Sequence, residues 1–204
     1  MDKVMQATNT ASATAQLGDI LELFEGVATH ADARKDYLPA LNAVRIYSEG
    51  GHLFAAATDR YRLISGRIEA DSILDLEKGL VPLADIKRIT ALLKGEGKRM
   101  DTLPVTFSRV ANLLTVSVRG NSVTVELLEG TFPPIGYLIK DEFEVQALDT
   151  VTINPAFMAD YAKIAGKGEP VSVTFTGAGK PLRISIAGHR VSWRALLMPM
   201  RDKR

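Results

Sequence analysis

The sequence repeats one pattern three times, and this repetition limits the possible folds more than any other feature. Each unit reads as a short amphipathic helix followed by three short strands, and is about 55 to 60 residues long. A unit of this size cannot bury enough apolar surface to be stable alone, so the units must pair. We therefore predict an α+β fold of β-α-β-β-β units, whose sheets lie together on one side and whose helices lie together on the other.

In the first unit, apolar residues recur at helical spacing between Leu17 and Ala28, and acidic residues occupy the opposite side of this segment. Three strand-like runs follow, at residues 43–47, 53–58 and 61–68. Gly50 and Gly51 are suited to a hairpin turn between the first two runs. Residues 1–15 contain one lysine and no apolar core segment. They therefore lack the features of a signal peptide, and we expect a frayed start.

The second unit opens with residues 80–82. Pro82 suits the entry of the helix that follows, because a missing N–H costs nothing there. Gly95 and Gly97 are expected to end this helix. The predicted strands lie at residues 105–108, 113–118 and 122–128.

The third unit opens with residues 151–153. Asn154 is a candidate cap for a helix whose first residue is Pro155. The predicted strands lie at residues 171–175, 182–186 and 191–197.

The best domain boundary is the long joint at residues 131–148, which carries Pro133, Pro134 and an acidic patch. We expect one domain at residues 12–138, built from units at 12–72 and 78–138. Residues 146–201 then form the third unit, a partial domain.

Composition excludes several classes of protein. The net charge of +1 argues against a protein that coats nucleic acid by bulk electrostatics. The absence of cysteine excludes disulfides and thiolate metal sites. No apolar run reaches the ~18 residues of a membrane span. His30, His52 and His189 share no metal-ligand spacing, so we predict neither a metal site nor a cofactor.

The sequence contains no recognisable pair of nucleophile and base, so we predict a protein that is not an enzyme. An enzyme that uses Asp59 with Arg60 or Arg62 is the alternative. A carboxylate flanked by arginines is more often a structural ion pair than a catalytic base.

Three motifs carry a resemblance to a known family. They are ATDRYRL at residues 57–63, ELLEGTFP at 126–133 and LLMPMR at 196–201. In this order, each at the end of a unit, they resemble the signatures of the bacterial β sliding clamp, the β subunit of DNA polymerase III. The resemblance covers residues 17–201.

The resemblance implies a non-catalytic replication processivity factor in the cytoplasm. A factor of this family forms a ring that encircles double-stranded DNA without reading its sequence. It tethers the DNA polymerase, the clamp loader and other proteins through a peptide-binding pocket. Retention on DNA is then topological, so a net charge near zero is compatible with it. The alternative is an adaptor of the same fold that binds partner peptides without encircling DNA.

The resemblance also implies two sets of site residues. Candidate DNA-facing residues are the cations on and after the second and third helices, namely Lys87, Arg88, Lys94, Lys98, Arg99, Lys163 and Lys167. The first helix is acidic and would repel phosphate. The candidate peptide pocket consists of Leu41, Thr58, Arg60, Arg62, Leu63, Pro82, Leu196, Leu197, Met198, Pro199, Met200 and Arg201. A simpler interpretation makes Leu63, Leu196 and Leu197 ordinary core residues.

The sequence departs from the family in two ways. Family chains carry six units and this chain carries three, and the family's terminal leucine is replaced by Asp202. Rings of about twelve units would need four such chains, with third units pairing across subunits. We therefore expect a homo-oligomer, with a tetramer as the first choice and a trimer as the alternative.

Overall fold

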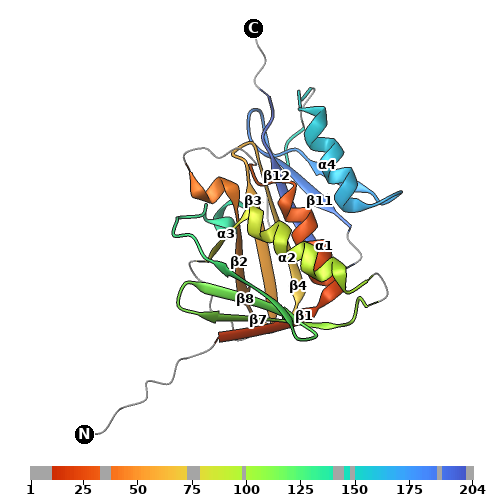
Figure 1. Ribbon diagram of the computed structural model, residues 1–204. Helices are drawn as coiled ribbons and strands as arrows, with labels where there is room; N and C mark the ends of the chain where they lie inside the picture. The colour runs from red at the N-terminus through yellow and green to blue at the C-terminus, as the bar shows by residue number, and fades with distance from the viewer. Residues whose placement is uncertain are drawn as a thin grey trace, which may run out of the picture.

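The computed structural model describes residues 11–32, 38–72, 79–97, 100–139, 145–147, 150–187 and 190–200. Two antiparallel sheets form one layer, and helices α1, α2 and α4 lie on one side of them (Figure 1). This arrangement confirms the predicted α+β architecture. Within the described residues, no helix combines the length and the apolar character needed to cross a bilayer.

The first unit contains one strand that the sequence did not indicate. Its elements are β1 (Ala11–Gln16), α1 (Leu17–Ala28), the 3-10 helix η1 (Pro39–Asn42), β2 (Ala43–Glu49), β3 (His52–Thr58), β4 (Arg62–Glu69) and β5 (Asp71–Ser72). The expectation of a frayed start is therefore wrong for residues 11–15. These residues pair with a strand of the second unit, and Ala13 and Ala15 are buried. Gly50 and Gly51, with φ of 57° and 77°, form the predicted turn.

The second unit follows the predicted pattern closely. Its elements are β6 (Leu80–Pro82), α2 (Leu83–Gly95), β7 (Pro104–Val110), β8 (Leu113–Val118) and β9 (Asn121–Glu126). Leu83, Ile86, Ile89 and Leu93 form the buried stripe of α2. A short helix, α3 (Ile135–Leu138), lies in the joint that leads to the third unit.

The third unit differs from the prediction at its start. Its elements are α4 (Pro155–Ala165), β10 (Val171–Thr174), β11 (Leu182–Ile186) and β12 (Ser192–Leu197). The Asn154 side chain accepts a hydrogen bond from Ala156 N at 3.0 Å, which confirms the predicted cap. Residues 151–153 are not a strand. The physical reason is that a strand needs a neighbouring edge, and no described strand lies beside this segment.

The opening strands of the first two units are exchanged. The five-stranded sheet has the order β5-β1-β7-β8-β9, so β1 of the first unit joins the strands of the second. The seven-stranded sheet has the order β10-β11-β12-β4-β3-β2-β6, so β6 of the second unit joins the strands of the first. In the same sheet, β12 pairs with β4 and thereby attaches the third unit to the first.

The main core lies between the sheets and the helices. At the joint of the first two units, the rings of Phe24 and Phe107 meet edge to face at 6.1 Å. At the joint of the first and third units, Trp193 lies opposite Gly66 in the sheet. A Cβ at Gly26 of α1 or at Gly66 would overlap the indole, so both glycines leave room for that ring. A smaller apolar cluster, including Leu63, Phe132 and Leu196, lies on the other face of the sheet.

Candidate functional site

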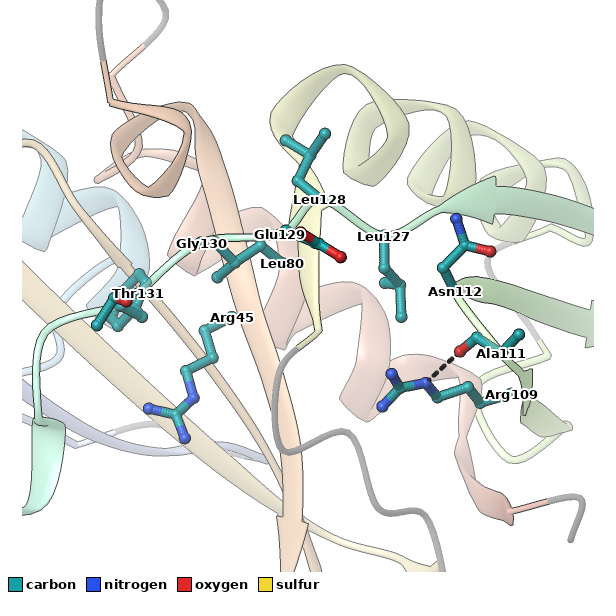
Figure 2. Close-up of a pocket in the computed structure, with 11 residues that line it drawn as sticks. Arg45, Leu80, Arg109, Ala111, Asn112, Leu127, Leu128, Glu129, Gly130 and Thr131 are labelled. Atoms are coloured by element: carbon teal, nitrogen blue, oxygen red, sulfur yellow. Dashed lines mark hydrogen bonds between the residues drawn. The ribbon is translucent and has the colours of Figure 1, made fainter.

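A cavity of ≈ 810 Å³ opens where the first and second units meet. Arg45 and Arg109 extend toward this space from two different sheets, and Leu80 lies between them (Figure 2). On β2, Arg45 alternates with Val44 and Ile46, which belong to the main core. The cavity therefore lies on the sheet face away from the helices. None of the residues that line it belongs to the predicted peptide pocket.

The predicted pocket residues gather at the seam between β4 and β12. The register places Leu63 opposite Leu196, and Arg62 opposite Leu197. On the other side of β4, Leu63 also faces Thr58 at the end of β3. The sequence motifs at residues 57–63 and 196–201 are therefore neighbours in space, although they lie in different units.

The turn between β3 and β4 is held by side chains of the first motif. Asp59 Oδ1 accepts hydrogen bonds from the N–H groups of Tyr61 and Arg62, each at 3.0 Å. Thr58 Oγ1 donates to Arg62 O at 2.7 Å and accepts from Arg60 N at 3.2 Å. Arg60 has a φ of 77°, a conformation that side chains rarely adopt. These bonds compensate for that strain and direct the Tyr61 side chain outward.

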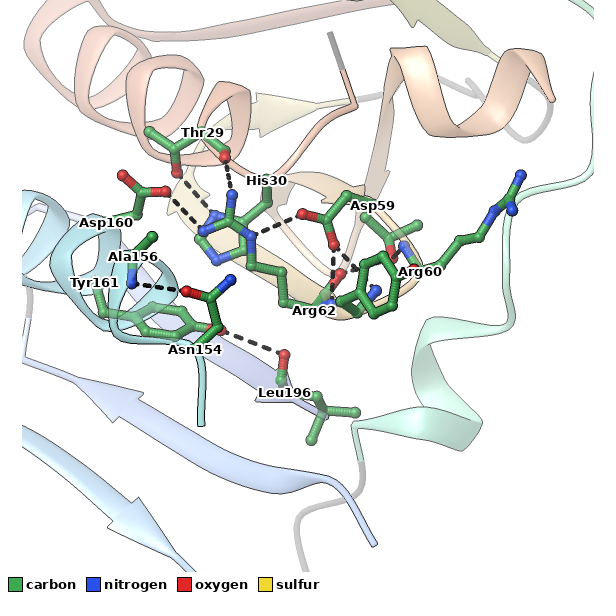
Figure 3. Close-up of polar contacts among 12 residues, drawn as sticks. Thr29, His30, Asp59, Arg60, Arg62, Asn154, Ala156, Asp160, Tyr161 and Leu196 are labelled. Carbon is green, nitrogen blue, oxygen red and sulfur yellow. Dashed lines mark hydrogen bonds and ion pairs between the residues drawn. The ribbon is translucent and has the colours of Figure 1, made fainter. Parts of the chain in front are cut away.

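Arg62 links the first unit to the third (Figure 3). Its guanidinium donates to Asp59 Oδ2 at 2.9 Å, to Asp160 Oδ2 at 2.7 Å and to Thr29 O at 2.7 Å. Burial disfavours the charged form of Arg62, but the hydrogen bonds to Asp160 and Asp59 outweigh that effect and raise its pKa. Asp160, which also accepts from Lys163 at 2.8 Å, is on α4. Partial burial opposes its ionisation, yet these hydrogen bonds lower the pKa of Asp160. Asp59 in turn is an ion-pair partner of Arg62, through its Oδ2 atom.

His30 lies fully buried beneath this network. Its Nδ1 is 2.8 Å from Thr29 Oγ1, and that hydroxyl donates to Gly26 O at 2.8 Å. The hydroxyl proton is thus used, so Nδ1 is the protonated nitrogen and Nε2 is a buried acceptor without a partner among the described residues. Burial, assisted by the charge of Arg62, lowers the pKa of His30 to about 3. The imidazole is neutral at physiological pH and packs against the Tyr161 ring at 5.0 Å.

Exposed apolar side chains lie beside the seam. Tyr61 is 57% exposed, Met198 is 38% exposed and Met200 is 52% exposed. Met198 N donates to Tyr61 O at 2.7 Å, so the two chain segments run together. The half-buried Phe157 ring stacks on Tyr61 at 6.4 Å and lies 4.3 Å from the Arg62 guanidinium. The seam therefore presents an adaptable apolar surface beside the buried Arg62, whose charge is paired with Asp59 and Asp160.

Other predicted pocket residues are less accessible. Leu63 and Leu196 are buried against residues 132–139, and Leu197 belongs to the main core. The simpler interpretation of these three as core residues therefore holds for their side chains in this structure. Pro82 lies at the same end of the sheet, but β2 and β3 separate it from the seam. The remaining members are Leu41, which is buried in η1, Pro199, which is half-buried, and Arg201, which lies outside the described residues.

The predicted DNA-facing cations differ in their environment. Arg88, Lys94 and Lys163 form ion pairs with Asp85, Glu25 and Asp160 at 2.6, 2.5 and 2.8 Å respectively. Lys87 and Lys167 are exposed and form no salt bridge within the described residues. Lys98 and Arg99 lie outside the described residues.

The acidic first helix is partly neutralised. Glu25 pairs with Lys94 of α2, and Asp19 lies 3.5 Å from Arg190 of the third unit. The sequence did not reveal these pairings, because each joins residues from different units. They weaken the repulsion that the charges of α1 alone would produce. Among the described residues, no group of three potential ligands could hold a metal ion.

Three residues of the seam were missed as site residues. Tyr61 lies inside the first motif and could have been found as the aromatic residue between its arginines. Phe157 follows the helical spacing of Tyr161 and Ile164, which is typical of a buried stripe, whereas its ring is only half-buried and meets Tyr61. Asp160 gave no signal, because its partner Arg62 is 98 residues away along the chain.

Comparisons with known proteins agree on one family. Residues 21–134 match the family described as DNA polymerase III beta subunit, central domain. The Beta sliding clamp of Micrococcus luteus is 29% identical over 152 residues, which cover 72% of this chain. The chain spans about half of that relative's length, 47%.

Solved structures share the fold at low sequence identity. The DNA polymerase sliding clamp of Pseudomonas aeruginosa has a TM-score of 0.75 at 14% identity, covering 94% of this chain and 67% of that one. DNA polymerase III, beta subunit, of Thermotoga maritima has a TM-score of 0.77 at 16% identity, covering 99% and 68%.

Proposed function

The chain belongs to the DNA polymerase III beta subunit family, and we propose from this premise that it is a sliding clamp. In this role it is a non-catalytic, cytoplasmic ring protein that encircles duplex DNA and tethers the polymerase, the clamp loader and other replication proteins. The match over residues 21–134 is the observation that carries the proposal. The gathering of two distant motifs at the β4–β12 seam supports its second part, the binding of partner peptides.

The helix layer is the proposed inner wall of the ring. Lys87 and Arg88 on α2, and Lys163 and Lys167 on and after α4, would meet phosphates through weak, salt-screened contacts. Such contacts carry no sequence information, and the closed ring rather than its charge would retain the DNA.

Circular DNA tests this arrangement. The protein is loaded on a nicked plasmid by a bacterial clamp loader and isolated by gel filtration, and half of the sample is then linearised. We expect the protein to remain on the circle and to leave the linear form. Equal retention on both forms would contradict topological binding. Peptide binding without retention on the circle would favour the adaptor of the same fold.

The proposed peptide site is the apolar surface of Tyr61, Met198 and Met200 with the Arg62 and Leu63 region behind it. The pocket inferred from the family also includes Leu63 and Leu196, which a peptide could reach only after residues 132–139 move. A few apolar anchors on such a surface give a dissociation constant in the micromolar range, which corresponds to a binding free energy of about −8 kcal/mol.

Fluorescence anisotropy with a labelled clamp-binding peptide from a bacterial polymerase measures this affinity. A chain that ends at Leu197 should lose peptide binding and keep its oligomeric state. A chain that ends at Met200 is the matched control and should keep both. Unchanged affinity in the shorter chain would place the peptide site elsewhere.

The proposed assembly is a homo-oligomer. If a ring contains about twelve units, three-unit chains close it as a tetramer. Multi-angle light scattering of the purified chain tests this number. A stable monomer at micromolar concentration would contradict a closed ring.

A further inference from the structure

The first two units complete each other by exchanging their opening strands in a fixed register. Gln16, which precedes α1, faces Pro104 at the start of β7. Pro82, which precedes α2, faces Ala43 at the start of β2. In both opening strands, the residue just before Gln16 or Pro82 faces the core. An opening strand of one unit thus covers the edge of the first strand after the helix in the other unit.

In all three units, the opening segment is also bonded to the end of its own unit, and in the same way. In each case, the chain that follows the last strand of the unit bonds to the residue two positions before the helix cap. In the first unit Thr14 pairs with Asp71, and in the second Leu128 N donates to Leu80 O at 2.8 Å. In the third, Met200 N donates to Thr152 O at 2.9 Å. Residues 151–153 are therefore positioned as an opening strand, although they do not form one.

The third unit also has the edge that such a segment would cover. Strand β10 is the last strand of the seven-stranded sheet, whereas its counterparts β2 and β7 are each covered by an exchanged strand. Its core-facing residues Val171 and Val173 are only half-buried. The residues equivalent to Val171, Val44 and Val105, are fully buried, as are Ile46 and Phe107, which are equivalent to Val173. Gln146 N donates to Phe175 O at 3.1 Å, just beyond the end of β10.

The helix of the third unit shows the same deficit. Seven residues of α1 are buried, including Ile20, Leu23 and Phe24, and α1 packs against α2. In α4, only Tyr161 and Ala165 are buried. The third unit therefore resembles one half of an interlocked pair whose other half is absent.

We propose that the missing half is the third unit of a second copy of this chain, which exchanges residues 150–153 onto the outer edge of β10. One unit carries both the segment that is donated and the edge that receives it. Two copies related by a twofold axis can therefore satisfy each other. Within one copy they cannot meet, because residues 151–153 lie beside the chain that follows β12, and β11 lies between β12 and β10.

The alternation of apolar residues fixes the register of this exchange. Val151 and Ile153 pack toward the main core, as do Val171 and Val173 of β10. A shift by one residue would turn one of these sets to solvent. Ile153 must therefore face Val171 of the partner, Thr152 must face Ser172, and Val151 must face Val173.

A proline supports the same alignment. In this register Asn154 faces Pro170, just as Gln16 faces Pro104 in the pair formed by the first two units. The overlap of residues 150–153 with residues 171–174 ends before Phe175, so the contact with Gln146 can remain.

Engineered disulfides test the register, and the chain contains no cysteine of its own. Thr152 and Ser172 are both exposed, so the double variant Thr152→Cys/Ser172→Cys changes no core residue. Opposed residues of antiparallel strands lie within disulfide range. Under mild oxidation we expect the double variant to run mostly as a covalent dimer on non-reducing gels. We expect each single variant to form at least ten times less covalent dimer than the double variant.

The matched control is Thr152→Cys/Thr124→Cys. Thr124 is an exposed threonine on β9, the edge strand of the other sheet. Equal cross-linking of the control would indicate random collision and overturn the inference.

The inference rests on the homo-oligomer of the proposed function, but not on DNA or peptide binding, so the two can fail separately. Oligomers by light scattering without the Thr152–Ser172 cross-link would reject this exchange and leave the clamp intact. A covalent dimer that is not retained on circular DNA would support the exchange and reject the clamp.

Discussion

The first unit is joined to its two neighbours in different ways. With the second unit it exchanges whole strands and packs α1 on α2, so backbone pairing runs through both sheets. With the third unit it shares one seam, β4 on β12, reinforced by Trp193 and by the bond from Arg62 to Asp160. The same unit can therefore be fastened by interlocking or by edge addition. The second kind of joint has one backbone ladder where the first has two, so we expect its side chains to matter more and the joint to be the easier one to break.

The largest expected effect comes from the aromatic residue at each joint. Trp193→Ala and Phe107→Ala each remove a buried ring, and each should lower the free energy of unfolding by about 3–5 kcal/mol. Urea denaturation measures the loss. If the seam depends on few side chains, Trp193→Ala should also separate the third unit, giving two transitions where Phe107→Ala gives one.

Trp193→Phe is the control for size. The indole Nε1 is buried and has no hydrogen-bond partner among the described residues, so phenylalanine removes an unsatisfied donor while it keeps much of the ring. We expect a clearly smaller loss than for alanine. An equal loss would mean that the indole shape itself, rather than its volume, holds the seam.

The next effect concerns Arg62. Arg62→Met leaves Asp59 and Asp160 without their shared cation, and such a change at a buried ion pair costs about 3–5 kcal/mol. Since Asp160 is 21% exposed, we expect a value near the lower end of that range. The exposed neighbour provides the matched variant Arg60→Met, which should change stability by less than about 0.5 kcal/mol. Similar losses in both would show that the network does not hold the third unit.

Lowering the pH provides a third comparison of the joints, with a smaller expected change in stability. His30 remains neutral in the folded protein down to a pKa of about 3, whereas the unfolded chain protonates it near pH 6.5. The unfolded state therefore binds more protons between these values, and stability falls as the pH decreases. This residue contributes at most about 1.4 kcal/mol per pH unit.

Denaturation at pH 7, 6 and 5 measures that slope, with His30→Phe as the non-titrating comparison. The variant should show the shallower pH dependence. Because His30 packs against Tyr161 of α4, tryptophan fluorescence should report loosening of the seam first. Parallel slopes for the two proteins would remove His30 as the cause.

The smallest effect is expected at the first joint. Lys94 on α2 pairs with Glu25 on α1 at 2.5 Å, and both side chains are about half exposed. Lys94→Ala should therefore cost only about 0.2–1 kcal/mol. The exposed lysine Lys87, on the same helix, gives the matched variant Lys87→Ala. A loss above 2 kcal/mol at Lys94 would mean that the interlocked joint also depends on single side chains.

Much of the fold could be predicted, because helical spacing and strand alternation are local signals. The Asn154 cap and the turn at Gly50 and Gly51 follow from chemistry within four residues. Strand β1 was missed because it carries no such local signal. Its buried residues are the alanines Ala13 and Ala15, and only the neighbouring β7 makes the segment a strand.

The candidate site was predicted less completely. Thr58 and Arg62 were found because the first motif carries the family resemblance, and the structure brings them to the seam with the last motif. Pro82 was added to the same pocket, although two strands separate it from the seam. Asp160 and Phe157 belong to the seam through contacts between units, which no local pattern records.

The space around the Trp193 indole has an evolutionary consequence. Gly26 and Gly66 cannot gain a Cβ while the indole is present, and loss of the indole would leave a void between them. Changes at the three positions are therefore coupled. A lineage that enlarges either glycine has to shrink the aromatic residue in the same period, so relatives should inherit or lose the set together.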